Sequence, residues 1–161
     1  MSTIAIERQT SPLGSTHSAR RSADYPFRIL LVDDEPSICA LNAKALAKSG
    51  YRVDSAEDGS VAWLILQLQS YDLMITDNNM PNLSGIGLIK NLRGASMALP
   101  IIMATGMAPH DEFDRDPCLK PDAILNKPYS VGELLETVAI VLQASACCRG
   151  PISPPQVQPD L

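Results

Sequence analysis

The sequence predicts an α/β protein with a doubly wound sheet of five parallel strands, and three observations support this fold class. Five short apolar segments alternate with segments of helical periodicity, an order typical of a parallel sheet covered by helices on both faces. Several apolar segments lack polar residues at alternate positions, as strands buried on both faces do. Turn-forming and acidic residues follow these segments, at the positions where ligands bind in such sheets.

The composition indicates one globular domain that neither spans a membrane nor binds nucleic acid. The chain has 161 residues, of which 45% are hydrophobic, and this length suffices for one full core. No apolar run approaches the roughly 20 residues of a membrane-spanning helix, and the N-terminus lacks the apolar segment of a secretory signal. The net charge of −5 argues against a nucleic-acid-binding surface, which is usually basic. Four cysteines without metal-binding spacing predict reduced thiols in a cytoplasmic protein: Cys39, Cys118, Cys147 and Cys148.

The ends of the chain differ in composition from its centre. Residues 1–26 are rich in Ser, Thr and Arg, and residues 145–161 are rich in Pro. Both segments are predicted to be disordered tails because they lack apolar periodicity. A single ordered domain is therefore expected at residues 27–144.

The first strand is predicted at Ile29–Val32, which is apolar throughout. Acidic residues 33–35 and Pro36 follow it and suit the first turn of a helix, which ends at Gly50. A second, alternating strand is predicted at residues 51–55. The expected buried stripe of the first helix consists of Ile38, Leu41, Ala45 and Leu46.

The second helix is predicted from Asp58-Gly59 to about Gln69 and is apolar almost all round. The third strand, Leu73–Ile75, leads to Asp77, and turn-forming residues separate Asp77 from Gly85. Periodicity leaves two buried faces open for the second helix: one of Val61, Leu64, Ile65 and Leu68, and one of Ala62, Trp63 and Leu66.

The remaining segments continue the alternation. Prolines between the fourth and fifth strands limit the intervening helix to a short one. Ser130 and Glu133 form a capping box that opens the last helix. The predicted bounds are Ser84–Arg93 for the third helix, Leu99–Ala104 for the fourth strand, Asp111–Asp116 for the short helix and Ala123–Leu125 for the fifth strand.

Polar side chains follow four of the predicted strands. Asp33 and Asp34 follow the first, Asp77 the third, Thr105 the fourth and Lys127 the fifth. Each alone fits a turn or a helix cap, but together they are expected to converge at one edge of the sheet. Clustered carboxylates suit a hard cation such as Mg²⁺, and a lysine beside them pairs with a carboxylate or a phosphoryl oxygen. The group predicts phosphoryl transfer, with Asp77 as the nucleophile because it stands alone.

At these positions the chain resembles the receiver domains of two-component response regulators, the chemotaxis-regulator-like family. The resemblance covers about residues 27–144 and implies a flavodoxin-like (βα)5 fold with strand order 2-1-3-4-5. The combination of motifs is specific, although no single motif is. The matching motifs are Leu30–Pro36, Asp58-Gly59, Asp77 with Met80-Pro81 and Gly85, Ala104-Thr105-Gly106, and Lys127-Pro128-Tyr129.

The resemblance implies a phosphoryl acceptor and a metal site. Asp77 would accept a phosphoryl group from a histidine kinase or a histidine phosphotransfer protein. Asp34 and Asp77 would bind Mg²⁺ (or Mn²⁺) directly, together with the backbone carbonyl of Asn79. Asp33 would contribute through a water molecule.

The resemblance also implies a switch, from which this chain departs in two places. Thr105 and Lys127 would contact the phosphoryl group, and the bond before Pro128 would be cis. The family often has an aromatic residue three positions before the lysine, where this chain has Ile124. The proline-rich segment before the fifth strand replaces a regular fourth helix, so we expect atypical output or dimerisation through Met107–Leu125.

For the second helix, the resemblance favours burial of Ala62, Trp63 and Leu66. Val61, Leu64 or Leu68 would then be partly exposed and are predicted to form a surface for a partner protein.

The sequence is therefore interpreted as a single-domain response regulator, a phospho-accepting switch and not an enzyme. Its output is expected through phosphorylation-dependent contacts with an unidentified protein target, and homodimerisation is left open. One alternative is a degenerate receiver that binds partners without phosphorylation. A cofactor-binding flavodoxin-like protein would need a Gly- and Ser/Thr-rich loop after Ile29–Val32. An aspartyl-phosphate phosphatase would need an aspartate where Asn79 stands.

Overall fold

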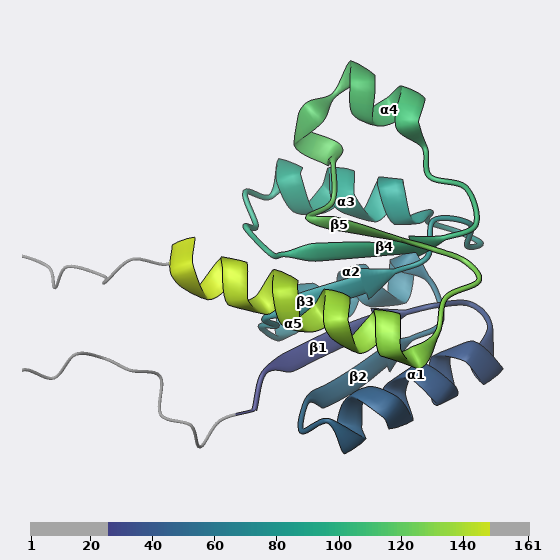
Figure 1. The fold of residues 1–161 in the computed structure, drawn as a ribbon. Coiled ribbons are helices and arrows are strands. Elements are labelled where there is room, and N and C mark those ends of the chain that lie inside the picture. The colour runs from purple at the N-terminus through teal and green to yellow at the C-terminus, as the bar shows by residue number, and fades with distance from the viewer. Residues whose placement is uncertain (1–25, 149–161) are drawn as a thin grey trace, which may run out of the picture.

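The computed structural model describes residues 26–148, in which five parallel strands form one sheet in the order β2-β1-β3-β4-β5 (Figure 1). This is the fold class and the strand order expected from the sequence. Both edges of the sheet are formed by strands most of whose residues are at least partly exposed. The strands are β1 (Arg28–Val32), β2 (Arg52–Ala56), β3 (Leu73–Thr76), β4 (Ile101–Thr105) and β5 (Ala123–Asn126).

The helices alternate with the strands and cover both faces of the sheet (Figure 1). The segment between β4 and β5 forms a short helix and a 3-10 turn, as its prolines predicted. The helices are α1 (Pro36–Lys48), α2 (Gly59–Leu68), α3 (Gly85–Gly94), α4 (His110–Arg115) and α5 (Val131–Cys148), with the 3-10 helix η1 at Pro117–Leu119.

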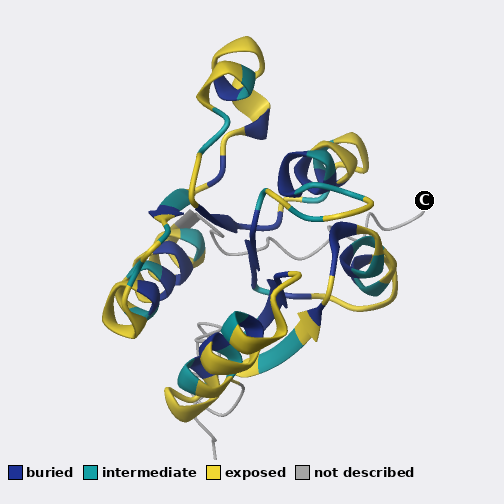
Figure 2. Cartoon of the chain, turned by 90° about the vertical axis from the view of Figure 1, so that its right-hand side faces the viewer, coloured by how far each residue is buried: buried dark blue, intermediate teal, exposed yellow. Residues whose placement is uncertain are grey.

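The core consists of two apolar clusters, one on each face of the sheet. Along β1, Leu30 and Val32 belong to the cluster under α2 and α3, whereas Ile29 and Leu31 belong to the cluster under α1 and α5. This division follows from the alternation of side chains along a strand. Figure 2 shows the buried segments along the sheet and on the inner faces of the helices. The central strands are therefore buried on both faces.

The buried face of α1 differs from the prediction. Leu41 is 58% exposed, and the buried residues of this helix are Cys39, Asn42 and Leu46. The prediction is confirmed for Leu46, whereas Ile38 and Ala45 are half-buried. The prediction was wrong for Leu41 because the buried face includes a polar residue, Asn42. Asn42 can be buried because its amide is hydrogen-bonded to the hydroxyl of Tyr129.

The structure decides between the two faces of α2. Ala62 and Leu66 are buried, whereas Leu64 is 62% and Leu68 82% exposed. The face favoured by the resemblance is therefore the one that packs on the sheet, with Trp63 half-buried at its margin.

The helix α5 continues to Cys148, four residues past the predicted end of the domain at 144. The predicted tails otherwise lie outside the described residues. Within residues 26–148, no helix is long and apolar enough to cross a membrane. The thiols of Cys39, Cys118 and Cys147 are free, the first buried and the other two exposed.

Candidate functional site

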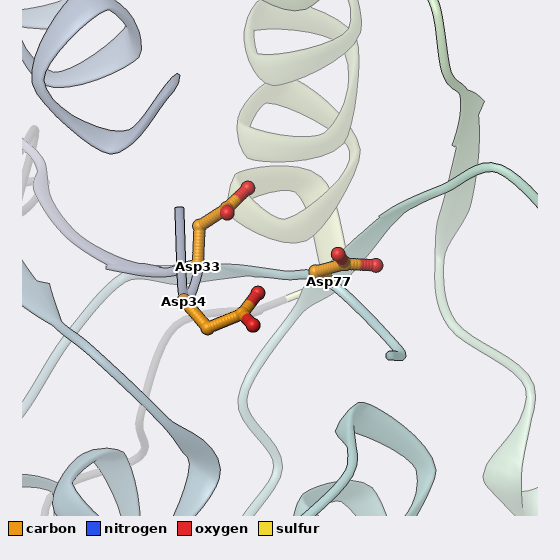
Figure 3. A group of neighbouring side chains, drawn as sticks. All are labelled: Asp33, Asp34 and Asp77. Carbon is orange, nitrogen blue, oxygen red and sulfur yellow. The ribbon is translucent and has the colours of Figure 1, made fainter. Parts of the chain in front are cut away.

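Three aspartates converge where β1 and β3 end. Asp33 and Asp34 follow β1, and Asp77 follows β3, its neighbour in the sheet (Figure 3). The last residues of the two strands are paired, and the amide of Asp77 donates to the carbonyl of Val32 at 3.0 Å. One carboxylate oxygen from each aspartate lies within 4.8 Å of the others. The pairing of the strands therefore brings together carboxylates that are far apart in the sequence.

The carboxylate of Asp77 is held by hydrogen bonds on both of its oxygens. The amides of Asn78 and Asn79 donate to Oδ1 at 2.5 and 3.3 Å, and the ammonium of Lys127 donates to Oδ2 at 3.1 Å. Asp77 is only 9% exposed. Its carboxylate therefore has a defined orientation.

Lys127 follows β5, which forms one edge of the sheet, and its ammonium contacts two of the carboxylates. Its Nζ lies 3.1 Å from Oδ2 of Asp33 and 3.1 Å from Oδ2 of Asp77. Burial of the ammonium lowers the pKa of Lys127, but the hydrogen bonds and charges of Asp77 and Asp33 outweigh this effect and leave the pKa raised. The lysine is therefore charged at neutral pH and offsets the repulsion between the two carboxylates.

Asp33 also shapes the turn into α1. Its Oδ1 accepts a hydrogen bond from the amide of Glu35 at 2.9 Å, while Oδ2 faces Lys127. Asp33 is 4% exposed, whereas Asp34 is exposed to solvent. The pair therefore contributes one fixed inner carboxylate and one outer carboxylate that is accessible from solution.

Thr105 lies at the same edge, at the end of β4, and is fully buried. Its hydroxyl donates to the carbonyl of Met107 at 3.2 Å and accepts from the amide of Met107 at 3.3 Å. The hydroxyl is thus engaged by the loop that follows β4. Contact with a phosphoryl group at Asp77 would require it to exchange these partners.

The connection from β3 to α3 depends on two residues beside Asp77. A Cβ atom at Gly85 would lie 2.3 Å from the carbonyl oxygen of Asp77, so only glycine fits where α3 approaches the strand. The side chain of Asn78 accepts a hydrogen bond from the amide of Ile86 at 3.1 Å. The sequence indicated Asn78 only as a turn residue, and its role at the start of α3 was missed.

Two further predicted positions are described by the structure. The Lys127–Pro128 peptide bond is cis. Ile124, at the position where the family often has an aromatic residue, is half-buried and packs against the core cluster under α2 and α3.

The donor set fits a hard divalent cation. The three clustered side chains offer oxygen ligands, which Mg²⁺ and Mn²⁺ prefer in proteins. Asp34 is exposed, so water molecules can complete the coordination, as Mg²⁺ usually requires. Asp33, Asp34 and Asp77 could therefore hold such an ion.

Comparison with known families agrees with this geometry. A family model for the response regulator receiver domain matches residues 29–139. The chain therefore belongs to the receiver domain family of two-component systems. The match begins at the second residue of β1 and ends within α5.

Curated relatives include larger proteins that contain a similar segment. The chain is 34% identical over 136 residues to the sensor histidine kinase RcsC of Salmonella typhi, covering 83% of this chain and 14% of RcsC. It is 38% identical over 120 residues to the alkaline phosphatase synthesis transcriptional regulatory protein PhoP of Bacillus subtilis, covering 73% of this chain and 49% of PhoP. The chain thus spans half or less of the length of these relatives.

Solved structures share the fold. The chemotaxis protein CheY4 of Vibrio cholerae is 30% identical with a TM-score of 0.67, and the match covers 73% of this chain and 99% of CheY4. The response regulator TrrA of Thermotoga maritima, solved in complex with Mg²⁺ and BeF, is 33% identical with a TM-score of 0.63, covering 71% and 98% of the two chains. Both likenesses extend over nearly the full length of the compared structure.

Proposed function

We propose that this chain accepts a phosphoryl group on Asp77 from the phosphohistidine of a histidine kinase or of a histidine phosphotransfer protein. The observation that carries this proposal is the carboxylate of Asp77, oriented by Lys127 and two backbone amides beside two further carboxylates. This arrangement supports the proposal because phosphoryl transfer requires a nucleophile, a fixed positive charge and metal ligands in one place.

In the transfer, an oxygen of the Asp77 carboxylate forms a bond to phosphorus while the bond from phosphorus to the imidazole nitrogen breaks. The electron pair of the broken bond stays on the imidazole, and the product on Asp77 is an acyl phosphate. A bound Mg²⁺ or Mn²⁺ would neutralise charge between the carboxylates and the phosphoryl oxygens. Its ligands would be Asp34, Asp77 and the backbone carbonyl of Asn79, with Asp33 acting through water.

Two other side chains would stabilise the phosphorylated form. The ammonium of Lys127 would pair with a phosphoryl oxygen, since it already lies 3.1 Å from the acceptor carboxylate. The hydroxyl of Thr105 would leave Met107 and donate to a phosphoryl oxygen. This exchange would change the loop after β4 and so convert phosphorylation into a change of surface.

The output of such a switch is contact with another protein. We propose a phosphorylation-dependent protein target, with the chain acting as a switch and not as an enzyme. A single-domain regulator and a cytoplasmic location stay predictions from the sequence, and homodimerisation stays open.

The first test is the mass of the intact protein after incubation with acetyl phosphate or phosphoramidate and Mg²⁺. A single phosphoryl adduct is expected on the wild-type protein and on Asp111→Asn, a control at an exposed aspartate of α4. Asp77→Asn should show no adduct, because the amide is not a nucleophile for phosphorus. An unmodified wild-type protein that still binds Mg²⁺ would instead indicate a receiver that binds partners without phosphorylation.

A further inference from the structure

A polar pair lies between α1 and the loop that joins β5 to α5. The side-chain amide of Asn42 donates to the hydroxyl oxygen of Tyr129 at 2.9 Å. Asn42 is 3% exposed and lies on the same face of α1 as the apolar core residues Cys39 and Leu46. Tyr129 is half-buried and packs against that same core cluster. A buried amide in apolar surroundings needs such a partner, because an unpaired one is costly.

This pair connects the two parts of the chain that build the acidic site. Asp33 and Asp34 lie just before α1, the helix that carries Asn42. Lys127 lies two residues before Tyr129 in the loop after β5. The strands β1 and β5 are separated in the sheet by β3 and β4, so no strand pairing sets the distance between Lys127 and Asp33.

Other contacts hold the same loop on different elements. The amide of Lys127 donates to the carbonyl of Thr105 at 2.9 Å and ties the loop to β4. The hydroxyl of Ser130 accepts from the amide of Glu133 at 3.2 Å, and the Glu133 carboxylate accepts from the amide of Ser130 at 2.7 Å, which ties the loop to α5. The Asn42–Tyr129 bond adds the tie to α1 and so to the aspartates.

Tyr129 remains a neutral hydrogen-bonding partner. Burial raises the pKa of its hydroxyl and the charges of Asp33 and Asp77 add to this, whereas the Asn42 contact and Lys127 act in the opposite direction. The pKa is raised overall, so the phenol is protonated at physiological pH.

We propose that Asn42 and Tyr129 are positioning residues, which hold the loop after β5 so that the Lys127 ammonium bridges Asp33 and Asp77. This inference rests on the proposed function in so far as the bridge serves phosphoryl transfer to Asp77. Both ammonium–carboxylate distances are 3.1 Å, so a shift of the loop by about 1 Å would weaken both contacts, and transfer reactions are sensitive to displacements of that size.

The test uses Tyr129→Phe, Asn42→Leu and the double variant. Tyr129→Phe leaves the amide of Asn42 without this partner, and Asn42→Leu leaves the hydroxyl of Tyr129 without it. Each single variant should therefore lower thermal stability. The double variant replaces both groups by apolar ones of similar shape and should recover stability. The phosphorylation rate with acetyl phosphate and Mg²⁺ should fall by about threefold to tenfold in all three variants, the range expected for one hydrogen bond. Tyr51→Phe, which removes a hydroxyl beyond the far end of α1, is the matched control with an unchanged rate.

The double variant separates positioning from simple packing. If its rate returns to the wild-type value together with its stability, the hydrogen bond is only structural and the inference is overturned. A rate that stays low in a protein of recovered stability supports positioning, because packing alone would restore both.

A second measurement does not depend on phosphorylation. In protein with ¹³C-labelled lysine, an ammonium held between two carboxylates should give the ε-methylene protons of Lys127 separate chemical shifts. In Tyr129→Phe and in the double variant, these shifts should merge, whereas in Tyr51→Phe they should stay apart. Separate shifts in all variants would overturn the inference. A wild-type protein that takes no phosphoryl group would refute the proposed function, and the lysine signals would then decide the positioning on their own.

Discussion

Lys127 shows how one residue allows carboxylates to share a confined site. Its ammonium contacts Asp33 and Asp77, and the resulting pKa is raised above the ordinary value of 10.5. For a group with a raised pKa in the folded state, the stabilisation is fully present below the unfolded pKa and is lost as the pH rises through the folded one. Loss of the lysine proton therefore leaves the ion pairs of the site intact throughout the neutral range and breaks them in strong alkali.

Tyr71 lies at the opposite end of β3 and permits a test of pH dependence. Its hydroxyl donates to Asp54 at 2.9 Å, and the guanidinium of Arg28 lies 4.7 Å from the centre of its ring. Burial, the hydrogen bond to Asp54 and the charge of Asp54 raise its pKa to about 12, and Arg28 opposes them. The stabilisation is thus complete below pH 10.0, the ordinary pKa, and lost as the pH rises towards the folded value.

We predict that Tyr71 contributes at most about a tenth of one tyrosine to the absorbance change of tyrosine ionisation up to about pH 11. Wild-type protein and Tyr71→Phe should therefore give nearly the same change at 295 nm between pH 8 and about pH 11. A clearly smaller change in the variant within this range would contradict the raised pKa. Circular dichroism at each pH checks that both proteins stay folded.

At the scale of the elements, α3 can approach the end of β3 closely because its first residue is a glycine. A Cβ atom at Gly85 would meet the carbonyl oxygen of Asp77 at 2.3 Å, and this backbone atom cannot turn aside as the end of a flexible side chain could. Gly85→Ala should therefore lower the free energy of unfolding by about 1–3 kcal/mol or more, because α3 or the end of β3 must shift. The phosphorylation rate of Asp77 should fall as well. Urea unfolding and intact-mass kinetics measure the two effects.

Gly94 at the end of the same helix is the matched control. A Cβ atom there has no heavy atom of the described residues within 4 Å, so Gly94→Ala should be neutral or stabilising by up to about 1 kcal/mol. Equal effects of the two alanine variants would show that the close approach at Gly85 is not needed.

The second helix separates residues that hold the fold from residues that face solvent. Leu66 is 4% and Leu68 82% exposed. Leu66→Ala should lower the free energy of unfolding by about 2–5 kcal/mol, whereas Leu68→Ala should change it by less than about 0.5 kcal/mol. Chemical denaturation of both variants measures the difference. A large loss in Leu68→Ala would refute the assignment of this face as free for a partner protein.

At the scale of the whole molecule, the acidic edge should couple metal binding to stability. A ligand that binds only the folded state adds about 2.7 kcal/mol at a free concentration of about one hundred times its dissociation constant. We predict that Mg²⁺ stabilises the protein in this way. The free energy of unfolding should be higher with Mg²⁺ than with NaCl at the same ionic strength. The charge of −5 makes that salt control necessary.

Asp34→Asn should remove most of this stabilisation, because it replaces the exposed carboxylate of the group by a weaker ligand. Asp111→Asn, outside the group, should keep it. If Mg²⁺ stabilises Asp34→Asn as strongly as the wild-type protein, the ion acts elsewhere on the surface.

Much of the architecture follows from local sequence signals. The apolar segments at β1, β3 and β4 and the polar residues that end them predicted the sheet, because burial on both faces leaves little choice of residue. The capping box at Ser130 and Glu133 and the short helix α4 were also predicted, since capping and proline effects act within a few residues. For α1 the same reasoning placed Leu41 in the core, although it is 58% exposed.

The sequence by itself determined the order of the elements and the residues at the strand ends, because periodicity and turn chemistry are local properties. Only the tertiary structure decided which groups meet. Asn42 and Tyr129 are 87 residues apart, and Lys127 and Asp33 are 94 apart. The backbone contact that requires glycine at Gly85 likewise depends on how α3 packs against β3. Such contacts depend on the relative placement of distant elements, which hydrophobic packing of the whole domain sets and no local pattern contains.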